Sequence, residues 1–240
     1  MKKLIRNTRG QFIIIAMMLI AVMIISIGAT MHRAITYYKH EPWEEYSTLI
    51  GDVELNARRL VELSLADFTQ NNDPAILGQN LRKYQSDLLK IYPSRGIILD
   101  STVATGTETY LGLTVIFNQG VTKVWNSQES CSVAKANFNI TIRSIGLSGY
   151  SFTEVALLKM RIIDANLTGI YVALKNENNL PVNDLTQGNF RVTGLNITSV
   201  SQFYDKTNGA VYHLTFEGTL PSPLVLNGWD NRGIKVVAQK

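Results

Sequence analysis

The sequence predicts an α+β protein in which a transmembrane helix and a helical stalk or hairpin precede an antiparallel β-sandwich outside the membrane. Three observations lead to this prediction. An uncharged apolar run fills residues 12–31, apolar residues recur every three or four positions over residues 43–92, and a period of two begins after residue 96. These patterns are typical of a membrane helix, of amphipathic helices and of half-buried strands, in that order.

The first element is the apolar run, which three small polar or flexible residues interrupt without any charge. About 20 apolar residues that rise about 1.5 Å each are long enough to cross the ~30 Å hydrocarbon core of a bilayer. A secretory signal has a shorter apolar core of about 7–15 residues. The length therefore predicts a transmembrane helix over residues 11–31 that stays on the mature protein.

Basic residues precede the start of this helix. Lys2, Lys3, Arg6 and Arg9 stand among the first ten positions without any acid. Because basic flanks stay on the cytoplasmic side, the sequence predicts a basic cytoplasmic leader over residues 1–10 and an extracellular C-terminal part. The net charge of +4 is partly due to this leader. No basic stripe interleaved with aromatic residues follows it, so nucleic acid is not a predicted partner.

Arg9, Gly10 and Gln11, followed directly by the apolar helix, resemble the class III signal peptide of archaeal type IV pilins and related surface proteins. The resemblance implies that a pilin-type signal peptidase cuts between Gly10 and Gln11. The helix would then remain as an anchor or become the packed core of a filament. Many pilins carry glutamate as the fifth mature residue, and this chain has Ile15 there. A start at Gln11 is the favoured outcome, and an uncleaved anchor or a discarded secretory signal are the alternatives.

Residues 32–95 are predicted to form a helical stalk or hairpin. Pro42 and two glutamates mark a helix start, because a first turn tolerates proline and acids complement the helix dipole there. Asp73-Pro74 marks the start of a second helix. The first helix either extends the membrane helix outward as a stalk or packs in a hairpin with the second. Packing is favoured because most amphipathic stripes are core, and the two arrangements can coexist. The stripe residues are Tyr46, Leu49, Ile50, Val53, Ala57, Leu60, Val61, Leu65 and Phe68, then Leu77, Leu81, Tyr84, Leu88 and Tyr92.

The β-rich part consists of residues 96–149, as a separate small domain or as part of one larger sandwich, and residues 150–240. Short strand-like runs between turns rich in Gly, Asn, Pro and Ser indicate an antiparallel sandwich. Asn208-Gly209 predicts a hairpin with a type I′ turn, because both positions tolerate positive φ. The expected strands cover residues 110–117, 134–142, 152–163, 169–174, 190–197, 210–216 and 234–238.

The stretch YVALKNENNLPVNDLTQGNF, from Tyr171 to Phe190, resembles Ig-like domains of surface and adhesin-type proteins. The shared form is a strand, a polar turn, Leu-Pro-Val, a further turn and Asn-Phe at the start of the next strand. The resemblance implies an Ig-like sandwich over residues 150–240, in which Leu180 and Val182 close one end. It implies a fold and no particular activity, because Ig-like sandwiches carry out unrelated tasks.

The sequence shows no constellation for catalysis, metal binding or cofactor binding, and we predict neither an enzyme nor a cofactor. The three histidines include no His-x-x-x-His pair, and residues 146–149 (Gly-Leu-Ser-Gly) fall short of a nucleophile elbow. The polar loop at residues 227–233 could offer oxygen ligands to calcium, but a turn is the favoured interpretation. Trp125 and Trp229 could form an aromatic ligand surface, although packing is favoured for them as well.

Cys131 is the single cysteine, so no intramolecular disulfide is predicted. Asn139, Asn166 and Asn196 each begin an Asn-x-Ser/Thr sequon, and all three lie on the predicted outer side. They are therefore candidate glycosylation sites.

Together these observations predict a single-pass membrane protein of pilin-like type, with an extracellular domain that has a structural or adhesive role. A polymerising subunit of a type IV pilus-like filament is the alternative, and Ile15 weighs against it. A membrane-tethered ligand- or carbohydrate-binding module ranks third. The expected partners are the membrane, a pilin-type signal peptidase and other pilin-like subunits.

Overall fold

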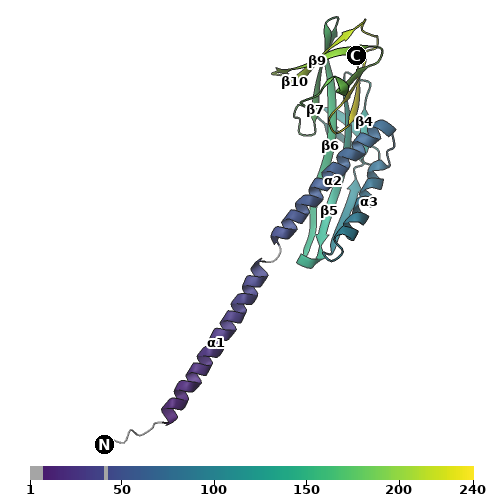
Figure 1. Cartoon of the computed structure of the whole chain (residues 1–240). Helices are drawn as coiled ribbons and strands as arrows, with labels where there is room; N and C mark the ends of the chain where they lie inside the picture. Colours follow the sequence, from purple (N-terminus) through teal and green to yellow (C-terminus); the bar gives the residue numbers. More distant parts are fainter. Residues whose placement is uncertain (1–7, 41–42) are drawn as a thin grey trace, which may run out of the picture. The chain divides into compact units, whose positions relative to one another are not determined.

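The computed structural model describes residues 8–40 and 43–240, and it describes side chains for residues 14–33 and 46–240. Over these residues the chain is an α+β protein with three α-helices followed by strands in antiparallel sheets (Figure 1). The chain divides between Val53 and Glu54 into two units. Most of the predicted basic leader, residues 1–7, lies outside the described part of the chain.

The first helix, α1, runs from Thr8 to His40 and contains the whole predicted apolar run. The segment Ile14–Arg33 is long and apolar enough to cross a membrane, and its most apolar part is not buried by other residues of the chain. Thr30 Oγ1 donates to the backbone oxygens of Ser26 and Ile27, both at 2.9 Å. The hydroxyl is therefore satisfied within the helix, as an apolar environment requires.

Two further helices confirm the predicted helical segment. Helix α2 runs from Trp43 to Asn71, and α3 runs from Ile76 to Ile91. Within the second unit they lie side by side, and Asn80 Nδ2 donates to Ser64 Oγ at 2.9 Å (Figure 1). Whether α2 also extends α1 as a stalk depends on residues 41–42, which lie outside the described residues. The buried stripe residues of this helix pair are Ala57, Val61, Leu65, Phe68, Leu77, Leu81 and Leu88.

One long antiparallel sheet forms the centre of the second unit, in the strand order β1-β5-β6-β7-β10-β9 with β4 paired to β5. Strand β6 runs from residue 147 to residue 166, so the two predicted β stretches share this sheet. The strands are β1 (Ile97–Val103), β4 (Val121–Val124), β5 (Glu129–Ile142), β6 (Leu147–Asn166), β7 (Gly169–Asn176), β9 (Asn196–Asp205) and β10 (Gly209–Glu217).

Helices cover part of one face of this sheet, which we call the inner face. Gln85 Nε2 of α3 donates to Ser101 Oγ of β1 at 2.8 Å, and Ser101 pairs with Phe138 of β5. Alternate residues of a strand share a face, so Ser132 lies on the same side of β5 as Phe138. Ser132 Oγ donates to the backbone oxygen of Lys235 at 2.6 Å, which places a further strand on this face.

That further strand belongs to a second sheet, of order β12-β11-β8, which completes a sandwich-like arrangement. The two sheets approach each other closely at Gly228, where a Cβ would lie 2.9 Å from Met160 Sδ and the Met160 side chain would have to shift. Tyr212, fully buried in β10, packs against Phe190 at 5.4 Å between ring centroids. The strands are β8 (Phe190–Val192), β11 (Val225–Trp229) and β12 (Lys235–Gln239).

The opposite, outer face carries a β-hairpin of β2 (Gly106–Tyr110) and β3 (Leu113–Phe117). The predicted single strand at residues 110–117 is wrong, because a two-residue turn with positive φ at Leu111 and Gly112 interrupts it. The hairpin covers part of the outer face and leaves the rest open. Its buried cluster consists of Ala104, Val115, Phe117, Cys131, Val133 and Leu157.

The predicted hairpin at Asn208-Gly209 is present between β9 and β10, but its turn is not of type I′. Gly209 has φ +80°, whereas Asn208 is not among the residues with positive φ, and three residues separate the paired Asp205 and Gly209. Asp205 Oδ2 accepts from Asn208 N at 2.9 Å and from Asn208 Nδ2 at 2.6 Å. This carboxylate favours the wider turn, because Asp side chains hydrogen-bond to nearby backbone N–H groups.

The predicted strand at residues 190–197 is also divided. Strand β8 ends at Val192 and β9 begins at Asn196, in a different sheet. Gly194 lies between them with φ +81°. The chain changes sheets at this turn, which a run of strand-forming residues does not reveal.

Candidate functional site

Gly10 and Gln11, which flank the suspected cleavage site, lie near the start of helix α1. The side chain of Gln11 is outside the described part of the chain, and cleavage between the two residues stays a prediction.

The three sequons lie at separate places in the second unit. Asn139 of β5 is half-buried and donates through Nδ2 to Ser151 Oγ at 3.0 Å. Asn196 is exposed at the start of β9. Asn166 is exposed at the β6–β7 turn, where its Oδ1 accepts from Thr168 Oγ1 at 2.5 Å. Asn166 and Asn196 are therefore more accessible than Asn139.

The predicted loop at residues 227–233 is a turn only in its second half, because residues 227–229 belong to strand β11. Asp230 is buried, and its Oδ1 accepts from the backbone N–H groups of Arg232 and Ile234, both at 3.0 Å. Its Oδ2 accepts from Arg232 Nε at 2.8 Å. Both carboxylate oxygens are thus engaged by donors of the same loop.

Arg232 continues from this loop into a network that joins three elements. Its Nη1 lies 3.1 Å from Glu62 Oε1 of α2 and 3.0 Å from Glu177 Oε2, just beyond β7. Its Nη2 donates to the backbone oxygen of Leu157 at 3.0 Å, and Glu177 Oε2 accepts from Leu157 N at 3.3 Å. Because β7 ends at Asn176, these two side chains take the hydrogen-bonding place of a neighbouring strand along β6.

The electrostatics agree with a structural role for this network. Burial alone would lower the pKa of Arg232, but the carboxylates of Asp230 and Glu177 outweigh burial and hold that pKa above its ordinary value. The guanidinium is therefore charged, and each of its three nitrogens has a partner within the protein.

Trp125 and Trp229 are partly buried against lysine side chains. Lys123 Nζ lies 4.2 Å from the ring centroid of Trp125, and Lys235 Nζ lies 5.6 Å from Trp125 and 5.5 Å from Trp229. Trp125 Nε1 donates to Ser132 Oγ at 3.0 Å. Desolvation, and then the charge of Lys235, lower the pKa of Lys123. These cation–π contacts engage the rings with the protein's own lysines, which favours packing over a free aromatic surface.

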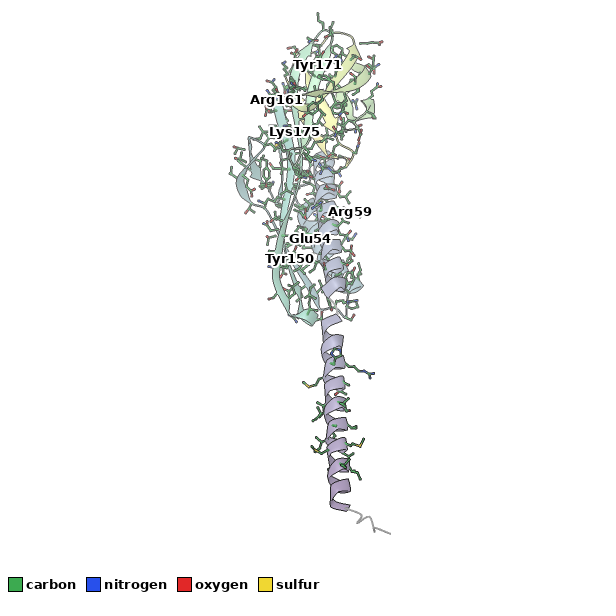
Figure 2. All side chains as sticks on the ribbon, turned by 90° about the vertical axis from the view of Figure 1, so that its left-hand side faces the viewer. Glu54, Arg59, Tyr150, Arg161, Tyr171 and Lys175 are labelled. Carbon is green, nitrogen blue, oxygen red and sulfur yellow. The ribbon has the colours of Figure 1, made fainter. Side chains whose placement is uncertain are left out.

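The open part of the outer face contains the strongest candidate for a binding site, a pocket of about 260 Å³. We call it the basic pocket. Figure 2 shows Arg161 and Lys175 close together on one side of the sheet, with Tyr171 nearby. The pocket is lined by Leu111, Glu129, Lys159, Arg161, Ala173, Lys175, Asn179, Thr207 and Asn208.

Strand register brings the charged residues of the basic pocket together. Glu129 of β5 pairs with Arg161 of β6, Lys159 pairs with Lys175 of β7, and Arg161 also pairs with Ala173. Cross-strand partners point to the same face, so one carboxylate and three cations share a small area. Turns form the rim: Leu111 at the β2–β3 turn, Asn179 after β7, and Thr207 and Asn208 between β9 and β10.

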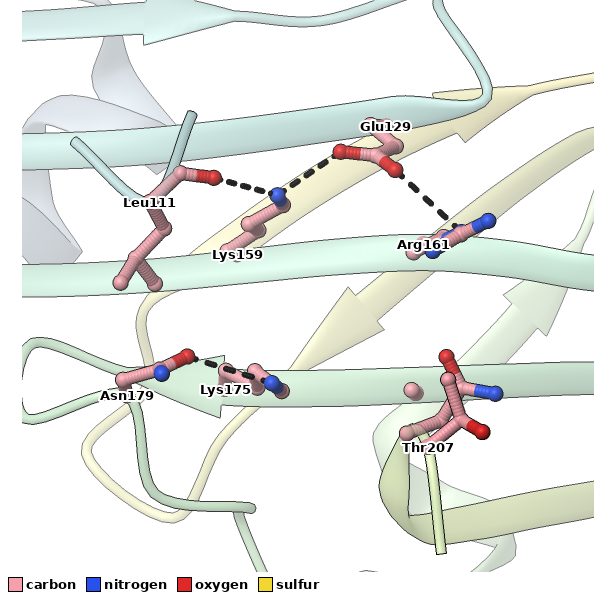
Figure 3. A pocket seen from close by; sticks show the side chains of 9 residues that line it. Leu111, Glu129, Lys159, Arg161, Lys175, Asn179 and Thr207 are labelled. Carbon is pink, nitrogen blue, oxygen red and sulfur yellow. Dashed lines mark hydrogen bonds and ion pairs between the residues drawn. The ribbon is translucent and has the colours of Figure 1, made fainter. Parts of the chain in front are cut away.

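The close-up in Figure 3 shows how these charges are engaged. Lys159 Nζ lies 2.7 Å from Glu129 Oε2 and also donates to the backbone oxygen of Leu111 at 2.7 Å. Arg161 Nε lies 3.2 Å from Glu129 Oε1, and Lys175 Nζ donates to Asn179 Oδ1 at 3.2 Å. The hydrogen bond from Lys159, with the charges of Lys159 and Arg161, lowers the pKa of Glu129. The pocket therefore has more positive than negative charge at neutral pH.

The sequence analysis missed this pocket, because its residues are spread over positions 111–208. One signal was present. Lys159 and Arg161 stand two residues apart within the predicted strand at residues 152–163, which puts both cations on one face of a sheet.

No protein-family model, curated protein or solved structure matches the chain in comparisons of its sequence and structure.

Proposed function

We propose that the chain is a single-pass, membrane-anchored surface protein, with its N-terminus in the cytoplasm and an extracellular domain that has a structural or adhesive role. The surface of α1 supports the anchor. The large apolar side chains from Ile14 to Met31 are 53–70% exposed, on all sides of the helix. An apolar surface of this length needs hydrocarbon or other apolar helices around it.

The alternative, a polymerising subunit of a type IV pilus-like filament, rests on the same helix. In a filament, apolar helices of several copies would surround one another in place of lipid. Lipid is as apolar as leucine, so such a transfer depends on helix packing and not on a hydrophobic driving force. Ile15 is part of the exposed apolar surface and offers no carboxylate for a contact with a neighbouring filament subunit. The membrane-anchored form is therefore the first proposal, and the filament subunit is the second.

A matched pair of variants tests the anchor. Ile24 in α1 and Leu63 in α2 are almost equally exposed, at 64% and 65%. Arginine at the centre of a membrane helix costs about 2.5–3.5 kcal/mol on insertion scales, whereas arginine on a water-exposed helix costs little. We expect Ile24→Arg to shift the protein out of the carbonate-washed membrane fraction, and Leu63→Arg to leave it there.

Two further measurements test orientation and processing. Protease added outside intact cells should degrade the chain after residue 42, and a protected C-terminal part would overturn the proposed orientation. The intact mass of the native protein should correspond to a start at Gln11. A start at Met1 would leave an uncleaved anchor, and a start beyond the apolar run would exclude the anchor itself.

A further inference from the structure

The basic pocket has unused binding capacity, in contrast to the network of Arg232, in which all three guanidinium nitrogens are engaged. Lys159 is engaged on two sides, by Glu129 and by Leu111, and its side chain is only 13% exposed. Arg161 contacts Glu129 through Nε, and its Nη atoms have no hydrogen-bond partner within the described part of the chain. Lys175 contacts a neutral amide oxygen, so two of its three N–H donors remain. Arg161 and Lys175 can therefore both bind an anion.

The geometry of these two cations fits a carboxylate. They stand on adjacent strands, since Arg161 pairs with Ala173, two residues from Lys175 on the same face. A guanidinium with free terminal nitrogens binds a planar carboxylate through two parallel hydrogen bonds. The carboxylate of Glu129 already contacts Nε of Arg161, so this guanidinium pairs with a carboxylate within the protein itself.

Apart from Leu111, the rim of the basic pocket is neutral and polar. Thr207 Oγ1 has no hydrogen-bond partner among the described residues, and the Oδ1 of Asn208 is not used by its contact with Asp205, which goes through Nδ2. Asn179 accepts from Lys175 through Oδ1 and retains its Nδ2 donors. Hydroxyl and amide groups of this kind pair with the hydroxyl groups of a sugar, because both can donate and accept.

We propose that the basic pocket binds a single sugar residue that carries a carboxylate, a hexuronate, with the carboxylate held by Arg161 and Lys175 and the ring hydroxyls facing Thr207, Asn179 and Asn208. The volume of about 260 Å³ lies just below the usual range for ligand pockets, which suits one sugar ring and not an extended chain. This inference rests on the pocket alone and not on the membrane anchor, so the two can fail separately.

The test is isothermal titration calorimetry of the full-length protein in detergent micelles. Glucuronate, glucose, acetate and inorganic phosphate are each titrated separately. Glucuronate should bind with a Kd of about 1 mM, as is reasonable for one small ligand with few contacts. Glucose and acetate should each bind at least about tenfold more weakly, because each lacks one half of the recognised chemistry. Equal binding of glucose would overturn the carboxylate site. Phosphate that binds as well as glucuronate, or the absence of glucuronate binding, would overturn the hexuronate.

Variants test separately the side of the pocket that binds the carboxylate and the side that binds the sugar hydroxyl groups. Arg161→Gln should weaken glucuronate at least about tenfold, because a charge-assisted hydrogen bond to the carboxylate is lost. Arg191→Gln, at an exposed arginine of β8, is the matched control and should leave binding unchanged. Thr207→Val should weaken glucuronate several-fold and leave acetate unaffected. Unchanged melting temperatures show that the variants are folded, and glucuronate binding by Arg161→Gln at the wild-type level would overturn the proposal.

Discussion

Two arginines on opposite faces of the same molecule have different environments. The side chain of Arg232 is 23% exposed, and its three nitrogens contact three carboxylates and a backbone oxygen. The side chain of Arg161 is 49% exposed and contacts one carboxylate through Nε. The two side chains have the same charge, so the number of engaged donors is what separates an arginine that joins elements from one that can bind a ligand.

We expect the largest loss of stability when Arg232, the arginine that joins three elements, is removed. Arg232→Ala should lower the free energy of unfolding by about 3–5 kcal/mol, because the carboxylates of Asp230, Glu62 and Glu177 would stay together without their counter-charge. Denaturant titration of the full-length protein in detergent measures this.

The matched control is Arg161→Ala, which should cost less than about 1 kcal/mol, since it removes an exposed ion pair. Equal losses for the two variants would show that the comparison does not separate a joining arginine from a binding one.

A smaller effect concerns acid pH at the basic pocket. Lys159 donates to Glu129 and holds its pKa below the ordinary value, so ionised Glu129 stabilises the folded state. This contribution is present above the pKa of the unfolded chain, about 4.3, and is lost as the pH falls through the lower pKa of the folded state.

Glu129→Gln should therefore flatten the decline in stability below about pH 4.3 and change the melting temperature little between pH 5 and 8. Thermal melts of the wild type and of the variant across this pH range measure the difference. Parallel declines in the two proteins would mean that Glu129 contributes nothing to the acid sensitivity.

The sequence predicted the elements of the fold better than their connections. The apolar run and the helical stripes located α1, α2 and α3, because helical periodicity is local and persists over many residues. The hairpin at Asn208-Gly209 was also predicted, but Asp205 sets its turn type through a side-chain hydrogen bond, which spacing does not reveal. The change of sheet at Gly194 depends on which sheet each strand joins.

The candidate site could not be predicted from the sequence, for a different reason. The basic pocket needs the register of β5, β6 and β7, and a shift of one residue would turn Arg161 to the opposite face. Register depends on long-range pairing, so the sequence shows at most that Lys159 and Arg161 share a face. The network of Arg232 likewise joins positions 62, 157 and 177, which no local pattern connects.

The smallest expected effect is that Cys131 does not react in the native protein. Its labelling then gives a second measure of the difference between Arg232 and Arg161. Burial raises the pKa of this thiol to about 11, although the charge of the neighbouring Lys159 opposes the shift. At pH 8 roughly one thiol in a thousand is then ionised, and Cys131 is fully buried as well. Because the thiolate is the reactive form, the native protein should resist a thiol-specific reagent at pH 8 and react once unfolded in denaturant.

The two arginine variants then give different labelling rates at Cys131. Labelling of a buried thiol follows the population of the open state when opening and closing are fast. Arg232→Ala raises this population, so its labelling should be faster by a factor that corresponds to the measured loss of stability. Arg161 lies two residues from Lys159, which pairs with Cys131 across the strands, yet Arg161→Ala should leave the labelling rate almost unchanged. Faster labelling in Arg161→Ala than in Arg232→Ala would show that local opening of the basic pocket exposes the thiol, and that this region is less rigid than the contacts of Glu129 and Lys159 imply.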